Sequence, residues 1–521
     1  MAGDYLLAID NGTQSVRALI FKPDGSLIAK KKVKITAYVS PHPGWAEQDP
    51  DYFWLKICEA CQGVILENSI NPSDIAGVAL TTQRSTLINL DKNGNPLRPA
   101  IHWLDQRQAN HFKPIGGLWG LLFDISGIRE TTNYFQTQAE ANWIAENQPE
   151  IWTQTDKFIF LSAFILNKLV GRIVDSVASQ VGYIPFDYKA LTWCKPSDWK
   201  WKACPALTKD MLPELVSPGE IIGQITKTAS HATGIPEGTP VVSAAADKAC
   251  EVLGSGCLSP DIACLSFGTT ATINTIHKKY YEVIPLVPPY PAAVPHRYSL
   301  EIQIYRGYWM IEWFKREFAQ SEQRLASQRN IQTEELFDEL LNAAPPGAMG
   351  LMLQPYWSPG VKVPGPEAKG AVIGFGDIHT RAHLYRAIVE GLGYALREGM
   401  DRTVKRTHIP IKQIVISGGG SQSPEAVQIT ADIFGIPTAV PSIYETSGLG
   451  AAIDIAVGLG FHSDFEIAVK EMTGIGHYID PNKENHKIYS DLYNRVYLKM
   501  YKQLKPLYEE IRDITGYPKT F

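Results

Sequence analysis

The feature that most constrains this fold is a unit that occurs twice, roughly half a chain apart. Residues 5–21 read as an apolar strand, a tight polar turn and a second strand, with a further hairpin turn at 23–25. Residues 262–276 repeat the pattern around Gly268-Thr269-Thr270. Such a repeat predicts two related domains, each opening with a β-hairpin whose turn faces a shared site.

Length and element order agree with a duplicated α/β protein. The chain has 521 residues, of which 45% are hydrophobic, which is too long for one ordinary core. Apolar strands alternate with helical patterns. Two strands are expected in 74–91 and one in 411–417, and helices in 134–152, 158–171, 382–406, 423–435 and 446–460. We place the domain boundary near 254–260, giving domains 1–256 and 257–521, and expect proline-rich 277–300 to be an irregular surface excursion.

Composition excludes several classes of protein. The net charge is −5, and the Lys30–Lys32 run is too short for the basic stripe of a nucleic-acid-binding protein. No apolar run approaches the ~20 residues that span a bilayer, and the N-terminus reads as a buried strand rather than a signal peptide. The seven dispersed cysteines indicate reduced thiols, with Cys58 and Cys61 as core residues of one helix. We therefore expect a cytoplasmic enzyme without a nucleic-acid or membrane partner; a homodimer is compatible with the sequence.

Three glycine-containing turns indicate a nucleotide site. The first, Asp10–Ser15, places Thr13, Gln14 and Ser15 where backbone N–H groups can cradle an anion, and Arg17 follows on the strand. The second is Gly268-Thr269-Thr270, and the third, Gly418–Ser421, lies between a strand and a helix. Each turn alone is weak evidence, but three in this order favour nucleotide binding. No G-x-x-x-x-G-K-[ST] sequence is present, so a P-loop is excluded.

Asp247 follows the apolar segment 241–246 and precedes a helix of small residues. A carboxylate at the end of a buried strand is costly unless it is paired or functional. A kinase needs one carboxylate to accept the proton of the attacking hydroxyl. The alternative is a structural helix N-cap, and this segment alone favours neither interpretation.

The complete set of motifs resembles the FGGY family of carbohydrate kinases, which have the actin-like (ribonuclease H-like) fold. The resemblance covers nearly the whole chain. The segments that carry it are IDNGTQSVRA (9–18), PGWAEQDPDYFW (43–54), GVALTTQRST (77–86), PAIHWLDQR (99–107), SAAADKACEVLGSG (243–256), LSFGTT (265–270), GAVIGFGDIHTRAHLYRAIVEG (370–391), VISGGGSQSP (415–424) and ETSGLGAAIDIAVGLG (445–460). Phe375 stands where a smaller aliphatic residue is usual.

The resemblance implies an ATP- and Mg²⁺-dependent kinase with two α/β domains and a deep interdomain cleft. Asp247 would be the catalytic base and a metal neighbour, and Asp10 would meet Mg²⁺ through water. Sugar would bind mainly to the first domain and ATP mainly to the second, with closure excluding water. The ATP contacts implied are Thr13, Gln14, Ser15, Arg17, Gly268, Thr269, Gly419, Gly420 and Ser423.

The sugar side departs from the family's familiar members. Gln83-Arg84 resembles the Gln-Arg of glycerol kinases, but Ser85 replaces the acidic residue that follows there, and the Met-His usual in xylulokinases is missing. Lys248 replaces the amide that commonly follows the catalytic Asp. The substrate contacts implied are Arg84, Ser85, Trp103, Asp105, Tyr134, Asp247 and Lys248. A small sugar or polyol, of pentulose or glycerol size, is the expected substrate.

The sequence also raises alternatives to a neutral substrate and to a kinase. Arg84 and Lys248 only donate hydrogen bonds, so they could bind an acidic group of a sugar acid. Lys248 could instead pair with Asp247, lowering its pKa and weakening the base, or with a nearby Glu. A non-catalytic sugar or nucleotide sensor would bind without turnover, although Asp10, Asp247 and all three turns are retained. A chaperone-type ATPase is excluded because two α/β domains leave no room for a peptide-binding domain.

Overall fold

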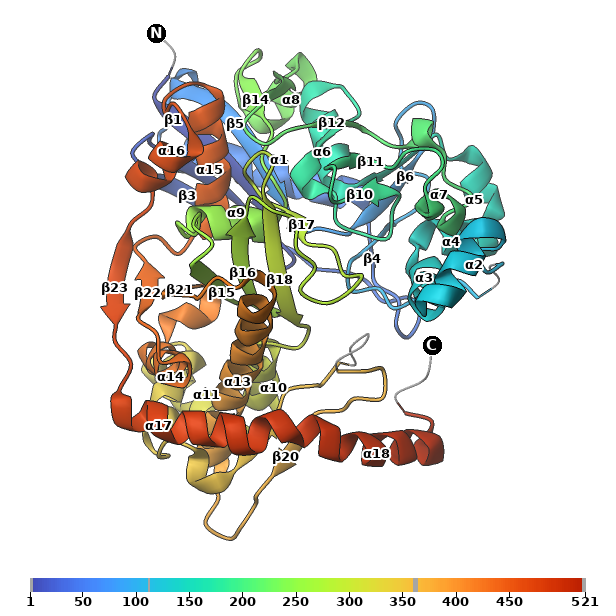
Figure 1. Cartoon of the computed structure of the whole chain (residues 1–521). Helices are drawn as coiled ribbons and strands as arrows, with labels where there is room; N and C mark the ends of the chain where they lie inside the picture. Colours follow the sequence, from blue (N-terminus) through green and yellow to red (C-terminus); the bar gives the residue numbers. More distant parts are fainter. Residues whose placement is uncertain (1–2, 111–112, 359–363, 518–521) are drawn as a thin grey trace. The chain divides into compact units, whose positions relative to one another are not determined.

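A computed structural model describes residues 3–110, 113–358 and 364–517 (Figure 1). The described chain forms two compact units, each assembled from separate stretches of sequence. The first unit comprises residues 1–256, 277–299 and 445–473. The second comprises residues 257–276, 300–444 and 474–521. In the described part of the chain, no helix combines the length and the apolar character needed to cross a bilayer.

The first unit is built on a six-stranded sheet. Its order is β13-β14-β5-β1-β2-β3, in which β1 pairs parallel with β5 and antiparallel with β2. The strands are β1 (Tyr5–Asn11), β2 (Ser15–Phe21), β3 (Leu27–Lys34), β5 (Ile75–Thr82), β13 (Ile221–Gln224) and β14 (Pro240–Val242). A second sheet, β4-β7-β6-β8, is made of β4 (Glu47–Gln48), β7 (Ala100–Ile101), β6 (Leu87–Leu90) and β8 (Lys157–Phe160).

Helices and short strands complete the first unit. The helices are α1 (Pro50–Glu67), α2 (Gly117–Ser126), α3 (Arg129–Gln138), α4 (Glu140–Asn147), α5 (Pro149–Gln154), α6 (Leu161–Val170), α7 (Trp199–Ala203), α8 (Lys227–Thr233), α9 (Asp247–Gly254), α15 (Thr446–Gly458) and α16 (Phe465–Met472). The short strands are β9 (Val174–Ser176), β10 (Phe186–Asp187), β11 (Thr192–Trp193), β12 (Glu214–Val216) and β17 (Tyr290–Pro291). The predicted helix at 158–171 was wrong at its start, because residues 157–160 pair as β8 with β6.

The second unit repeats the first sheet. Its six corresponding strands follow the order β18-β16-β15-β21-β22-β23, with β15 antiparallel to β16 and parallel to β21. They are β15 (Ile262–Phe267), β16 (Ala271–His277), β18 (Tyr298–Ile304), β21 (Gln413–Ser417), β22 (Thr438–Pro441) and β23 (Ile475–Ile479). Six strands follow the same order in both sheets, and β17 adds a seventh next to β18 in the second sheet; this shared order confirms the predicted duplication.

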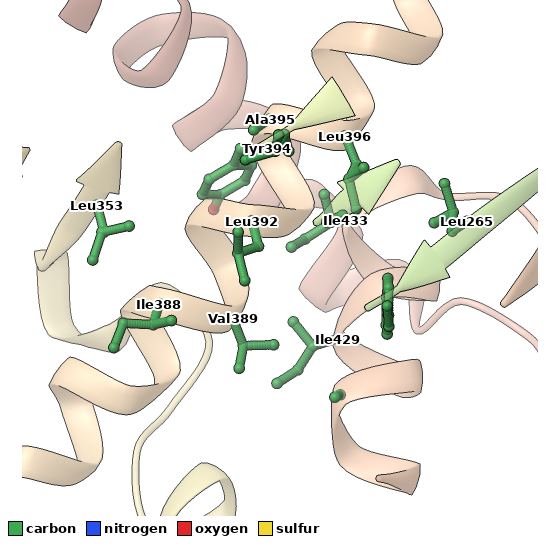
Figure 2. Packing of buried hydrophobic residues seen from close by; sticks show 14 of the residues in the cluster. Leu265, Leu353, Ile388, Val389, Leu392, Tyr394, Ala395, Leu396, Ile429 and Ile433 are labelled. Carbon is green, nitrogen blue, oxygen red and sulfur yellow. The ribbon is translucent and has the colours of Figure 1, made fainter. Parts of the chain in front are cut away.

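The core of the second unit surrounds α13 (Arg381–Thr407), the long helix expected at 382–406. Figure 2 shows Val389 of this helix close to Ile429 of α14 (Pro424–Phe434), in a cluster that also includes Leu392 of α13 and Leu265 of β15. Such burial contributes about 1.5–3 kcal/mol for each large apolar side chain. The other elements are β19 (Met352–Gln354), β20 (Ala371–Ile373), α10 (Trp309–Phe318), α11 (Gln320–Arg329), α12 (Phe337–Asn342), α14 (Pro424–Phe434), α17 (Lys483–Leu492) and α18 (Leu498–Thr515).

Two segments from the second half of the sequence pack into the first unit, which the sequence did not reveal. Helix α15 lies against β1, β5 and α9. A Cβ at Gly450 would approach the Cys250 carbonyl oxygen to 2.0 Å, so only glycine allows this close approach. The segment 277–299 is the other. The expectation of a surface excursion was wrong for Ala292, Ala293 and Val294, which are buried.

Candidate active site

The first polar turn lies between β1 and β2, where Asp10 faces Arg17 across the hairpin. The Arg17 Nη1 donates to Asp10 Oδ2 at 2.7 Å, and the Asp10 side chain is only 3% exposed. Burial raises the pKa of Asp10, while Arg17 opposes the rise. A buried carboxylate of elevated pKa gains from any additional cation, which suits a position near a nucleotide-bound metal.

The remainder of this turn is held by its own backbone and by Trp103. Gly12 N donates to the Ser15 carbonyl oxygen at 3.1 Å, which closes the turn. Trp103 Nε1 donates to Thr13 Oγ1 at 3.1 Å. Trp103 is half-buried, so it is placed beside the turn rather than deep in the core. Gln14 is exposed and Ser15 is buried. The predicted phosphate-side and sugar-side residues therefore meet at Thr13 and Trp103.

Asp247 is the first residue of α9, and Ala246 occupies the N-cap position. The strand predicted to deliver it is shorter than expected, because β14 ends at Val242. Asp247 Oδ1 accepts a hydrogen bond from Lys248 N at 2.8 Å. Asp247 is half-buried by surface area, yet its surroundings desolvate the carboxylate. The N-cap interpretation does not apply, because Asp247 lies inside the helix.

The pKa of Asp247 is raised to about 6. Desolvation by burial is the largest cause, and the negative charges of Asp10 and Glu251 add to it. The positive charges of Lys248 and Arg84 act in the opposite direction. A carboxylate with a pKa near 6 is still mostly ionised at neutral pH and is a stronger base than an ordinary Asp.

Lys248 pairs with a nearby Glu, one of the two arrangements foreseen from the sequence. Its Nζ lies 2.8 Å from Glu251 Oε2, one helical turn away, and the Glu251 side chain is 7% exposed. The sequence spacing i, i+3 could have predicted this pair. Glu251 therefore offsets part of the charge of Lys248, but Lys248 still lowers the pKa of Asp247 more than any other charged group.

Three further predicted sugar contacts are Arg84, Ser85 and Tyr134. Arg84 and Ser85 lie in the loop between β5 and β6, where Ser85 has a left-handed backbone (φ 57°) and its hydroxyl donates to the Val181 carbonyl oxygen at 2.7 Å. The Arg84 guanidinium lies over the Tyr290 ring at 4.7 Å. Tyr134, on α3, is half-buried and packs edge-on against Tyr183 at 6.2 Å.

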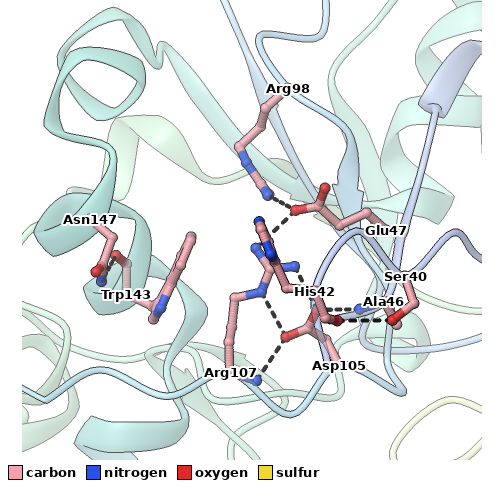
Figure 3. Close-up of polar contacts among 9 residues, drawn as sticks. All are labelled: Ser40, His42, Ala46, Glu47, Arg98, Asp105, Arg107, Trp143 and Asn147. Carbon is pink, nitrogen blue, oxygen red and sulfur yellow. Dashed lines mark hydrogen bonds and ion pairs between the residues drawn. The ribbon is translucent and has the colours of Figure 1, made fainter. Parts of the chain in front are cut away.

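Asp105 is engaged in a dense polar cluster, drawn in Figure 3. Its carboxylate accepts from Arg107 Nε at 2.7 Å, from Arg107 Nη2 at 2.6 Å and from Ala46 N at 2.6 Å. The Arg107 guanidinium in turn stacks over the rings of Trp45 (3.9 Å) and Trp143 (4.6 Å). Any contact between Asp105 and a sugar would compete with these partners.

Sequence reasoning missed several residues around the turn. Glu445 lies 3.5 Å from Arg17 and 3.1 Å from Lys30, and no local pattern could have linked positions so far apart. His102 Nε2 lies 3.0 Å from Gln83 Oε1, and burial lowers the pKa of His102 to about 4, so this ring is neutral. The Nε2 of buried Gln83 has no hydrogen-bond partner, so it could donate to a ligand.

The second unit contains the other two turns. Tyr308 N and Trp309 N, at the start of α10, donate to the carbonyl oxygens of Gly268 (3.0 Å) and Thr269 (3.3 Å). The third turn packs beside them, since a Cβ at Gly420 would lie 2.5 Å from the Tyr308 ring. Ser423 caps α14 by accepting from Ala426 N at 3.1 Å, and its hydroxyl also binds Asp338.

Gly419 differs from its neighbours. It is exposed, and a Cβ added there would meet no atom within 4 Å. Glycine is therefore not required at this position by the protein's own packing, which is consistent with the approach of a ligand. Among residues 3–110, 113–358 and 364–517, no group of three His, Cys, Asp or Glu side chains could hold a metal ion.

The paired sheets and their polar turns define a protein of the actin-like ATPase fold. Family models for the N-terminal and C-terminal domains of the FGGY family of carbohydrate kinases match residues 5–254 and 263–459. The chain belongs to this family, and it is a carbohydrate kinase.

Curated relatives of similar length carry several names. An uncharacterized sugar kinase, YgcE, of Escherichia coli is 27% identical over 99% of this chain and 98% of its own. A xylulose kinase of Staphylococcus epidermidis is 27% identical over 99% and 100%. A gluconokinase of Bacillus licheniformis is 27% identical over 94% of both chains.

Solved structures share the fold. The xylulose kinase of Rhodospirillum rubrum superimposes with a TM-score of 0.80 at 24% identity, covering 97% of this chain and 100% of the other. The glycerol kinase of Plasmodium falciparum, solved with ADP, has a TM-score of 0.75 at 17% identity, covering 95% and 98%.

Proposed function

We propose that the protein transfers the γ-phosphoryl group of ATP to a hydroxyl of a small neutral sugar or polyol, with Asp247 as general base. The observation that carries the proposal is the half-buried, desolvated Asp247 carboxylate at the start of α9, whose pKa is raised to about 6. The ionised Asp247 carboxylate can accept the proton of the sugar hydroxyl as the phosphoryl group is transferred.

The first unit is proposed to bind the sugar and the second unit to bind ATP. In the first unit, Arg84, Trp103, Tyr134 and Lys248 orient the sugar, and Ser85 and Asp105 shape the loops that present them. In the second unit, Gly268 and Thr269 are assigned to the phosphates, and Gly419, Gly420 and Ser423 to the adenosine end. Closure of the two units would exclude water, which otherwise competes as a nucleophile.

Mg²⁺ fits the carboxylates of the first unit. Asp10 raises the pKa of Asp247 through like-charge repulsion, so a divalent cation near both would relieve that repulsion. Asp10 would hold the ion through water, and Asp247 would lie next to it. The ion would supply charge neutralisation for the transferred phosphoryl group. Thr13, Gln14, Ser15 and Arg17 would meet the phosphates from the same side.

A kinase of a sugar acid is the second candidate, supported by the guanidinium of Arg84, whose charge lowers the pKa of Asp247. The Lys248–Glu251 ion pair weighs against it, because the Lys248 ammonium is already bound to a carboxylate one helical turn away. We therefore rank neutral sugars first.

Purified enzyme with MgATP should be assayed for ADP release against polyols, ketopentoses, aldoses and sugar acids, with mass detection of the product. We expect a singly phosphorylated neutral sugar or polyol. A phosphorylated sugar acid as the preferred product would support the second candidate. ADP release without any phosphorylated sugar would contradict both.

The ATP side can be tested at Gly419. Because an added Cβ meets nothing in the protein, Gly419→Ala should leave the melting temperature within about 1–2 °C. It should raise the KM for ATP by about 3–10-fold, since a methyl group would occupy space assigned to the nucleotide, and leave the KM for sugar unchanged. Gly420→Ala, which would strike Tyr308, is the contrasting variant and should lower stability as well. An unchanged KM for ATP in Gly419→Ala would remove Gly419 from the ATP site.

A further inference from the structure

The segment 277–299, here called the strap, connects β16 to β18 but packs with the first unit. Several contacts fix it there. Tyr298 Oη donates to the Lys189 carbonyl oxygen at 2.7 Å, and Arg297 forms an ion pair with Glu466. Tyr280 also packs against the hydrophobic cluster that contains Trp143 and Phe186. The strap is therefore a built part of the first unit.

The strap places Tyr290 beside the loop that carries Arg84. The Arg84 Cζ lies 4.7 Å from the centre of the Tyr290 ring, within the range of a cation–π contact. Tyr188 packs edge-on against the same ring at 6.2 Å. Tyr188 is itself buried and fixed, because its Oη bridges the Gly182 N (3.1 Å) and carbonyl oxygen (3.2 Å). Arg84 therefore rests on an aromatic support anchored to the body of the unit.

Arg84 is long and flexible, so its use in recognition depends on what fixes its guanidinium. Its charge lowers the pKa of Asp247, which shows that it lies near the reactive carboxylate. A planar guanidinium stacked on a ring carries its N–H groups at its edge, the side from which sugar hydroxyl oxygens would accept hydrogen bonds. Loss of the ring would remove one of the contacts that restrict the Arg84 rotamer, and sugar binding would then have to supply part of that order.

We propose that Tyr290 is a positioning residue for sugar recognition: its ring holds the Arg84 guanidinium in place and so determines affinity and selectivity for the sugar. This inference rests on the proposed function, since it assumes that Arg84 contacts the sugar. It assigns a role in substrate binding to a strap whose sequence lies in the C-terminal half of the chain.

The test replaces the aromatic face while keeping an apolar side chain. In Tyr290→Leu, the KM and the calorimetric Kd for the sugar should rise about 5–30-fold, whereas kcat and the KM for ATP should change less than twofold. Tyr290→Phe, which keeps the ring, should restore sugar affinity to within about twofold. Tyr298→Phe is the matched control, because it removes another strap contact without touching Arg84. Unchanged sugar affinity in Tyr290→Leu would overturn the proposal.

A double-mutant cycle separates positioning from general packing. In an Arg84→Ala background, Tyr290→Leu should cause no further loss of sugar affinity, because its effect passes through Arg84. A full additional loss in that background would overturn the proposal. If the Tyr290→Leu variant does not fold, the same measurements are made on Tyr290→Met, which also lacks the aromatic ring. If neither variant folds, Tyr290 is a structural residue and the proposal fails.

The activity of the wild-type enzyme shows whether a negative result contradicts the proposed function or only the role of Tyr290. If it phosphorylates no neutral sugar, polyol or sugar acid, the proposed function fails. If it is active but Tyr290→Leu behaves like wild type in both KM and Kd, only the role of Tyr290 fails.

Discussion

Asp105 and Asp247 are two desolvated aspartates of the first unit, and they differ in how their oxygens are used. Asp105 accepts charged and backbone hydrogen bonds from Arg107 and Ala46 (Figure 3). The Arg107 guanidinium also stacks on the rings of Trp45 and Trp143. Asp247 accepts from the Lys248 backbone, and the neighbouring lysine side chain is bound to Glu251 instead. Burial alone therefore does not mark a catalytic carboxylate. The hydrogen-bond partners of the two carboxylates differ, and this difference separates a structural role for Asp105 from the proposed role of Asp247 as a base.

The strongest test of this contrast is Asp247→Asn, together with Asp247→Ala. Either change removes the proposed base, so kcat should fall by about 10²–10⁴-fold. The Kd for ATP, measured by calorimetry, should change little because the assigned adenosine contacts lie in the second unit. Near-normal turnover in Asp247→Ala would rule out the proposed base.

Asp105→Asn, in contrast, should lower the stability of the protein and leave kcat nearly unchanged. The change removes the negative charge that faces Arg107, and breaking a buried ion pair costs about 3–5 kcal/mol of unfolding free energy. Glu47, which lies 2.8 Å from Arg107, should reduce this to about 2–3 kcal/mol. Urea unfolding followed by tryptophan fluorescence would measure the loss. The folded variant should keep kcat within a few-fold, and a loss of kcat as large as that of Asp247→Asn would erase the contrast.

The pH dependence of the reaction should report the surroundings of Asp247. Its pKa is raised to about 6, and the base must be ionised, so kcat/KM for the sugar should fall about tenfold per pH unit below that value. Lys248→Met removes a positive charge that lowers this pKa, so the acidic limb should move to higher pH. Glu251→Gln removes a negative charge that raises it, so the limb should move to lower pH. If the acidic limb of the pH profile lies at the same pH in both variants as in the wild-type enzyme, the limb does not report the ionisation of Asp247.

A smaller effect should appear in stability. The folded-state pKa of Asp247 lies above its ordinary value of 3.8, so the folded protein favours the protonated form. Its contribution to stability is therefore present below pH 3.8 and is lost as the pH rises through about 6. Asp247→Asn should raise the unfolding free energy at pH 8 by about 1–2 kcal/mol, and the gain should shrink towards pH 4. Denaturant titrations at the two pH values would show it. A gain that does not depend on pH would point to another cause.

The sequence predicted those parts of the fold whose signals are local. Strand, turn and strand at 5–21 and 262–276 were recognisable because apolar runs and glycine turns alternate over short distances, and both hairpins are confirmed. The helix at 423–435 was visible from its cap, Ser423, and its terminal glycine. Strand β8 was missed because its apolar residues run directly into α6, where periodicity cannot separate strand from helix.

The candidate site was less accessible to local reasoning. The Lys248–Glu251 pair follows a helical spacing, and the Asp105–Arg107 pair lies within three residues. Glu445 meets Arg17 only through tertiary folding, and the contact of Tyr290 with Arg84 depends on the path of the strap. These contacts join positions far apart in sequence, for which one sequence carries no signal.

The interleaved composition of the first unit has a consequence for how the protein is made. Residues 1–256 include β1 and β5, but the helix that packs on these strands, α15, begins at Thr446. During synthesis the N-terminal half therefore emerges with an apolar sheet face uncovered until most of the chain has been translated. A fragment ending at Gly256 would keep that face exposed and should aggregate. The division into two units is thus a property of the finished structure, whereas folding of the first unit must wait for the last quarter of the chain.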